Sequence, residues 1–401
     1  MNSPASLQAA VPGPKGPGFV RALTEWWGEK PLTQLAIFAI VGLGFALLGS
    51  NLVHNMARVG LTPGFGFLGH AANFEIGEGL IAYSAGDNYL RAITVGLLNT
   101  VRVSLAGCIL ATILGVALGI ARLSSNPLLS RLVQAYVEIV RNTPLLLQIF
   151  FWNALFHAMP GPRQALSPLP GVLLSNRGFF FPFIADDGTT LAILTSSFLL
   201  AVLVGAALKW RARRTGISNL KRSAALVFAA AIVPVAIAAF VGAVPAIDLP
   251  RLAGFNIRGG ISLSPEFMAL LIALVVNTSA SIAETVRAGI LSVSGGQWEA
   301  GRALGLSYGR IMRLIVLPQA LRVIIPVMTS SYLSLTKNSS LAVAIGFPDL
   351  VNILNTTANT TGQALEAILV MMLAYLALSL AVSIAMNAYN RRWALRERSA
   401  A

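Results

Sequence analysis

The chain has 401 residues, of which 56% are hydrophobic and only 11% are charged, and its formal net charge is +14. A water-soluble chain has about a quarter of its residues charged, so this composition excludes an ordinary soluble protein and indicates a polytopic membrane protein. A positive charge of this size suggests nucleic-acid binding in a soluble protein. Cationic loops that orient membrane helices produce the same excess, so we expect no nucleic-acid partner.

Eight apolar ranges predict membrane-spanning helices of about 20 residues each. In chain order they are 32–53, 91–120, 144–158, 190–208, 223–244, 265–288, 319–338 and 364–388. The third range is short, and its helix could begin several residues earlier.

Small residues recur along one face of the second predicted span. They are Gly96, Thr100, Ser104, Gly107, Ala111, Gly115 and Gly119. Because lipid gives no hydrophobic drive for helix association, such a face predicts close packing against a neighbouring helix rather than a ligand site.

Basic residues predict the orientation of the helices. With the N-terminus in the cytoplasm, 21 of the 29 Lys and Arg residues fall in cytoplasmic segments, seven in outward segments, and Arg102 within a span. Cytoplasmic loops carry such an excess. The sequence therefore predicts an all-α polytopic membrane protein with about eight transmembrane helices and both termini in the cytoplasm.

Polar residues within the sixth and seventh predicted spans are candidates for function. Glu284 and Arg287 lie about one helical turn apart. We interpret them as a structural ion pair or a contact with lipid headgroups at the cytoplasmic edge, with a gate as the alternative. A deeper set either lines a substrate route or makes hydrogen bonds between helices, and the sequence leaves both open. This set is Asn277, Thr278, Ser279, Ser281, Ser330, Ser331 and Ser334.

Motifs for enzyme or nucleotide chemistry are weak or absent. GFGFLG at 64–69 matches a dinucleotide-binding fingerprint, but it lies in a predicted external loop with no strand before it. No Gly-Lys dipeptide occurs, so there is no Walker A loop, and the three histidines lack metal-ligand spacing. We therefore expect no catalytic residue, metal site or cofactor in this chain.

A charged, glycine-punctuated segment, GQWEAGRALGLSYGRIMRLIVLP at 296–318, interrupts the apolar runs. Its residues alone predict a short cytoplasmic helix that Gly305 can end, or an interfacial amphipathic turn. The pattern Glu299-Ala300-Gly301, three residues, Gly305, nine residues, Ile315-x-Leu317-Pro318 resembles the cytoplasmic signature loop of bacterial ABC importer permeases. The family form is Glu-Ala-Ala, three residues, Gly, nine residues, Ile-x-Leu-Pro, so Gly301 is the one departure.

Further segments resemble the polar-amino-acid branch of these permeases. They are GLLNTVRVS (96–104), YVEIVRNTPLLLQ (136–148), SIAETVRAGILSVSGGQWEAGRALGLS (281–307) and KNSSLAVAIG (337–346). FGFLGHAANFEIGEGL at 65–80 and RLSSNPLL at 122–129 are similar to the general L-amino-acid uptake permeases of proteobacteria.

The resemblance implies a domain organisation around a five-helix permease core. We expect a cytoplasmic tail at 1–31, an extra first helix with an external loop at 32–88, the permease domain at 89–389 with inserted helices at about 159–264, and a tail at 390–401.

The resemblance also implies that this protein takes up general or polar L-amino acids across the bacterial inner membrane. The loop would couple this chain to a cytoplasmic ABC ATPase dimer that carries ATP and magnesium. The other expected partners are a second, homologous permease and an external amino-acid-binding protein. The alternative is a secondary amino-acid transporter driven by an ion gradient.

Overall fold

The computed structural model describes residues 31–58, 60, 64–184, 188–215, 220–240 and 247–398. Residues 1–30 and 399–401, which make up most of the first predicted tail and the end of the last, lie outside the described residues. The chain divides into two units, Met1–Phe65 and Gly66–Ala401. In the first unit, α2 (Pro31–Arg58) covers the first predicted span.

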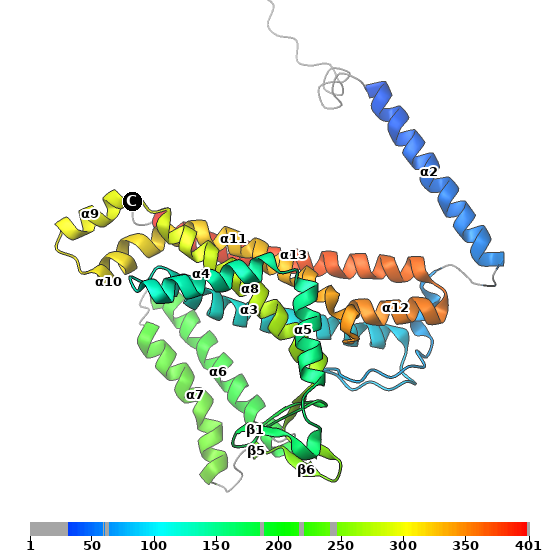
Figure 1. The fold of residues 1–401 in the computed structure, drawn as a ribbon, viewed down its shortest axis with the longest axis horizontal. Coiled ribbons are helices and arrows are strands. Elements are labelled where there is room, and N and C mark those ends of the chain that lie inside the picture. Colours follow the sequence, from blue (N-terminus) through cyan, green and yellow to red (C-terminus); the bar gives the residue numbers. More distant parts are fainter. Residues whose placement is uncertain are drawn as a thin grey trace, which may run out of the picture. The chain divides into compact units, whose positions relative to one another are not determined.

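The second unit is built mainly from helices (Figure 1). The long ones are α3 (Tyr89–Arg122), α4 (Pro127–Asn142), α5 (Leu145–His157), α6 (Gly188–Thr215), α7 (Leu220–Phe240), α8 (Pro265–Leu291), α11 (Leu317–Asn338), α12 (Leu350–Thr361) and α13 (Ala364–Arg398). Short helical segments are η1 (Phe65–Gly69, at the boundary between the units), η2 (Pro162–Gln164), α9 (Gly295–Ala303), α10 (Tyr308–Ile311), the π-helical η3 (Met312–Val316) and η4 (Ser339–Ile345).

All eight predicted spans coincide with helices, and the polytopic, mainly helical fold class is confirmed. Six helices among the described residues are long and apolar enough to cross a membrane. These are Thr33–Arg58, Tyr89–Arg122, Ser223–Phe240, Pro265–Leu291, Tyr308–Ile345 and Ala364–Asn390. The third predicted span is α5, a shorter apolar helix.

The residues before α5 form a separate helix rather than an extension of the third span. Asn126 caps α4 by accepting hydrogen bonds from the backbone N–H groups of Leu128 and Leu129. Thr143 is extended at the end of α4, and Pro144 precedes α5. Proline disfavours helical backbone at the residue before it, so α4 ends here and α5 begins as a separate helix.

The small-residue face of α3 packs against three helices in turn. A Cβ atom at Gly96 would lie 2.9 Å from Ile353 of α12, and one at Gly107 would lie 3.3 Å from Leu335 of α11. At Gly115 it would lie 2.7 Å from Ile282 of α8. The predicted packing role of this face is therefore confirmed, because larger side chains would push these helices apart.

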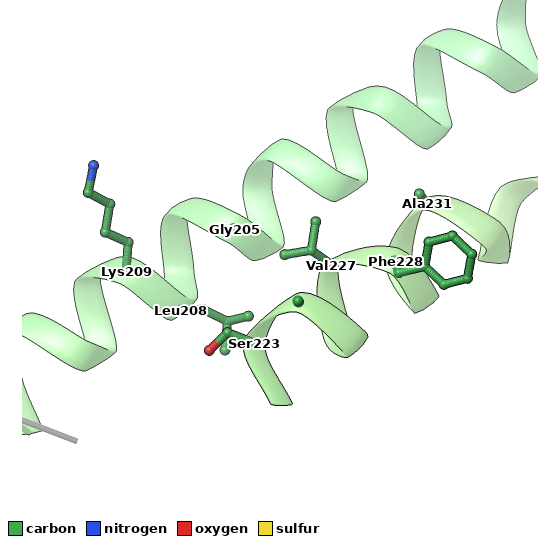
Figure 2. Close-up of a pocket in the computed structure, with 8 residues that line it drawn as sticks. Gly205, Leu208, Lys209, Ser223, Val227, Phe228 and Ala231 are labelled. Carbon is green, nitrogen blue, oxygen red and sulfur yellow. The ribbon is translucent and has the colours of Figure 1, made fainter. Parts of the chain in front are cut away.

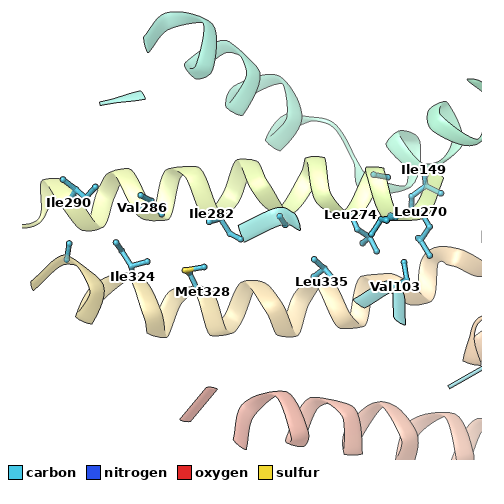
Figure 3. Packing of buried hydrophobic residues seen from close by; sticks show 14 of the residues in the cluster. Val103, Ile149, Leu270, Leu274, Ile282, Val286, Ile290, Ile324, Met328 and Leu335 are labelled. Atoms are coloured by element: carbon cyan, nitrogen blue, oxygen red, sulfur yellow. The ribbon is translucent and has the colours of Figure 1, made fainter. Parts of the chain in front are cut away.

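The main apolar core lies around α8. Ile324, Met328 and Leu335 of α11 face α8 in Figure 3, opposite buried residues that include Ile282 and Val286. Ile282 is fully buried, which is expected at the centre of a close-packed helix interface.

The range predicted to hold inserted helices, about 159–264, contains short strands that were not predicted from the sequence. They are β1 (Leu166–Leu169), β2 (Val172–Ser175), β3 (Gly178–Phe181), β4 (Phe183–Ile184), β5 (Ile247–Asp248), β6 (Arg251–Ala253), β7 (Asn256–Arg258) and β8 (Ile261–Leu263). One sheet has the order β1-β2-β3-β8, and β4-β5 and β6-β7 form two-stranded sheets, all antiparallel. Phe179 pairs with Leu263, so the two flanks of the α6–α7 insertion join into one strand region.

The helices α6 and α7 pack against each other. Figure 2 shows the hollow between them, about 580 Å³ in volume, where Val227 of α7 points toward Gly205 of α6. Of the residues that line it, Lys209 carries the one charge. A hollow with so few polar groups offers little for a polar ligand.

Candidate functional site

The segment between α8 and α11 folds as a short helix with a defined end. In α9, Glu299 and Ala300 are exposed. Gly305 adopts φ 70°, and the backbone N–H groups of Gly305 and Leu306 donate to the carbonyls of Arg302 and Gly301 at 2.9 and 3.1 Å. These two bonds make a Schellman motif, which needs a left-handed residue at Gly305. The prediction that Gly305 ends the helix is confirmed.

Gly301 is the buried residue of α9, and it lies against Ile311 of α10. A Cβ atom at 301 would lie 2.9 Å from Cγ1 of Ile311 and 3.2 Å from its Cγ2. The departure from the family's second alanine thus has a local physical reason. A β-branched neighbour occupies the space of the missing methyl group.

An aromatic pair joins α9 to α10. The rings of Trp298 and Tyr308 are stacked, with centroids 5.3 Å apart and an interplanar angle of 25°. Together with Glu299, Arg302 and Ile311 they line a hollow of about 360 Å³. Neither aromatic residue was predicted from the sequence, although Trp298 directly precedes Glu299.

The end of the segment is anchored in the apolar core. Ile311 and Val316 are buried, whereas Leu317 and Pro318 are exposed and Ile315 is half-buried. Pro318 lies in the first turn of α11, which begins directly after the residues of η3. A π-helical turn, Met312–Val316, joins α10 to α11, so the segment continues into α11 as helix.

Three charged side chains connect the C-terminal end of α3 to α8. Glu284 receives hydrogen bonds from Arg287, at 2.6 Å from Nη2 and 3.2 Å from Nε, and also from Arg122 at the end of α3. The predicted ion pair is confirmed, and Arg122 is an additional partner. All three side chains are less than one-third exposed.

The candidate pathway residues fall into two separate groups. On α8, the Ser279 hydroxyl is buried and lies 3.0 Å from the Tyr136 hydroxyl of α4, which is an interhelical hydrogen bond. Thr278 is buried, and Asn277 and Ser281 are half-buried. On α11, Ser330 and Ser334 are exposed, and a third serine is half-buried. That third serine is Ser331, whose hydroxyl donates to the backbone of its own helix.

The first half of α3 carries a second charged contact, which was not predicted from the sequence. Arg102 Nη1 lies 2.7 Å from Glu78 Oε1, and its guanidinium lies 4.3 Å from the centroid of the Phe267 ring. Asn99 Nδ2 donates to the carbonyls of Glu78 and Pro348 at 2.8 and 2.9 Å. The loop before α3 is thereby joined to α3, α8 and the segment before α12, and the Arg102 charge is compensated.

Asp349 begins α12 from a fully buried position between the spans. Its Oδ1 accepts the backbone N–H of Asn352 at 2.9 Å, which is an N-cap. Burial raises the pKa of Asp349 to about 7, because the desolvated carboxylate is disfavoured.

Comparison with known proteins gives consistent matches. The sequence model of the family described as "Binding-protein-dependent transport system inner membrane component" matches residues 111–395. The putative amino-acid ABC transporter permease protein YhdX of Escherichia coli is 46% identical, over 95% of this chain and 97% of its own. The general L-amino acid transport system permease protein AapQ of Rhizobium johnstonii is 42% identical, over 91% and 92% of the two chains.

The name of a third relative states its substrates. The glutamate/glutamine/aspartate/asparagine transport system permease protein BztB of Rhodobacter capsulatus is 38% identical. The match covers 91% of this chain and 93% of that protein.

Proposed function

This chain belongs to the family of binding-protein-dependent transport system inner membrane components, and on that premise we propose that it is the permease subunit of an ATP-driven importer of L-amino acids. It is a multi-pass inner-membrane transport permease. A broad substrate range is supported by relatives whose names specify general L-amino acids in one case and four acidic and amide amino acids in another.

The proposed coupling site is the cytoplasmic segment from α9 to the start of α11. Glu299 and Ala300 would meet the ATPase, since both are exposed on a short helix. Gly301 and Gly305 would shape that helix, and Ile315, Leu317 and Pro318 would carry its movement into α11. The single observation that supports this proposal most is the anchoring of the segment by buried Ile311 and Val316. Because these two residues are packed in the core, a displacement of α9 would also move the core residues around them.

The proposed partners are supported by the matched family, whose description is binding-protein-dependent transport. A separate ATPase dimer would bind ATP and magnesium and would drive two permease subunits between inward-open and outward-open states. A second, homologous permease would lie beside this one in the membrane. An external binding protein would deliver the amino acid.

For the substrate route, the exposed serines of α11 are better candidates than the buried residues of α8. Ser330 and Ser334 share an exposed face with Val323 and Val327, which a second permease subunit would face. Ser279 is already engaged with Tyr136, which supports an interhelical role for it and its neighbour Thr278. Asn277 and Ser281 stay as secondary candidates, and Ser331 bonds its own helix.

The test is amino-acid uptake into proteoliposomes that contain this chain, its partner permease, the ATPase and the binding protein. Glu299→Lys should lower ATP-dependent uptake by at least about tenfold, because it reverses a charge at the proposed interface. Glu138→Lys is the matched control, since Glu138 is an exposed acid on α4 outside the segment.

Uptake by this chain alone, driven by an ion gradient, would reject the proposal in favour of a secondary transporter. The matched family is defined by binding-protein-dependent transport, so that alternative has no support among the relatives.

A further inference from the structure

The hairpin of β6 and β7 carries two like charges for which the described part of the chain provides no ion-pair partner. Arg251 and Arg258 are direct cross-strand partners, and both are exposed. Like charges directly opposite each other on a sheet destabilise it. None of the ion pairs formed by the described residues includes either arginine. An anionic group from outside would therefore relieve the repulsion.

The turn of the hairpin adds an aromatic ring and a third guanidinium. Gly254 adopts φ 66° in the turn, and the next residue, Phe255, is 72% exposed. The guanidinium of Arg163, from η2, lies 4.0 Å from the centroid of the Phe255 ring. A charge held on the ring face opposes insertion of this ring into lipid hydrocarbon. Arginine and aromatic residues are instead enriched in the centres of protein–protein interfaces.

The face of the hairpin opposite the two arginines is packed against the rest of the protein. Ile257, between the two ends of β7, is 4% exposed and lies on the face opposite Arg258. The strand region ends directly at the start of α8, and α9 follows the end of α8. Since α8 has 27 residues, about 40 Å of helix separates the two regions. With α9 in the cytoplasm, the hairpin faces the outside.

We propose that the arginine hairpin, defined as β6, β7 and their turn together with Arg163, docks an acidic surface of the external amino-acid-binding protein. This inference rests on the proposed function, which requires such a protein. In the free permease, Arg251 and Arg258 repel each other. In the complex, acidic side chains of the binding protein compensate both, and the exposed charges orient it as it approaches.

The experiment measures the affinity between two purified partners. One is the binding protein that supports uptake, and the other is the assembled transporter in nanodiscs of zwitterionic lipid. Arg251→Glu with Arg258→Glu should weaken binding by about tenfold or more and should remove its dependence on salt. Arg251→Glu alone should also weaken binding, yet it places opposite charges across the hairpin and so should leave the melting temperature unchanged or higher. Arg177→Glu is the matched control, because Arg177 is exposed on the turn between β2 and β3.

The outcomes separate this inference from the proposed function. With the double variant, uptake should recover at high binding-protein concentration, because docking is impaired and the transport cycle is intact. Equal affinities of wild type and double variant would overturn the docking surface while ATP-dependent uptake stands. Charge-sensitive binding to vesicles of anionic lipid, with unchanged affinity for the binding protein, would also overturn it. Absence of ATP-dependent uptake by the wild-type transporter would reject the proposed function itself.

Discussion

Gly301 lies against Ile311, so closely that a methyl group at position 301 would come within 2.9 Å of Ile311 Cγ1. Ile311 is 1% exposed and β-branched, so it has little freedom to move away. The two residues act as a fitted pair that sets how α9 rests on α10. A small residue in one helix is matched to a large one in the next.

The first prediction concerns Gly301→Ala. Helix propensity favours alanine by about 1 kcal/mol, but forcing a methyl group into a packed contact costs about 1–3 kcal/mol. We expect a net loss of stability and a lower ratio of transport to ATP hydrolysis. In an Ile311→Ala background the same Gly301→Ala change should cost less stability, because the clashing carbons are absent there. A Gly301→Ala transporter as well coupled as wild type would contradict the fitted-pair interpretation.

The second prediction concerns the Trp298–Tyr308 stack. Tyr308→Leu removes a ring contact worth about 0.5–1.5 kcal/mol, so the affinity of the permease for the ATPase should fall by up to about tenfold. Tyr308→Phe keeps the ring and is the matched control. Binding of the ATPase to detergent-solubilised permease measures the effect. If the leucine and phenylalanine variants bind equally well, the stack does not fix the angle of α9.

The spans and the short helix α9 could be predicted from the sequence because each depends on local patterns. Apolar length marks the helices, and Gly305 marks the end of α9 through its backbone conformation. The strands were missed because each has two to four residues and pairs with distant ones, as Phe179 does with Leu263. The same limit hid the Trp298–Tyr308 stack and the Arg102–Glu78 pair. Spacing along the chain does not determine which side chains meet across a turn or between elements.

The third prediction concerns Glu284, which holds Arg122 and Arg287 together. Glu284→Gln leaves two guanidinium groups without a countercharge. The cost should be about 1–3 kcal/mol, between the values for exposed and buried ion pairs. Thermal unfolding in detergent should show a clearly lower melting temperature for this variant than for wild type. The double variant Arg122→Gln/Glu284→Gln should lose less than the sum of the two single variants, because each single variant already breaks the same pair. Additive losses would show that the two residues do not interact.

The last prediction concerns the pH dependence set by Asp349. Its pKa is raised from an ordinary value of 3.8 to about 7, chiefly by burial. Between these two values the folded protein holds a proton that the unfolded chain has released. The contribution of this group to stability is therefore fully present below about pH 4 and is lost as the pH rises towards 7. Asp349→Asn keeps a capping side chain that does not titrate. Relative to this variant, wild type should lose melting temperature between pH 5 and pH 7 and change little above pH 8. Because all other groups are shared, parallel curves for the two proteins across this range would show that the carboxyl group titrates normally and that its burial has no energetic effect.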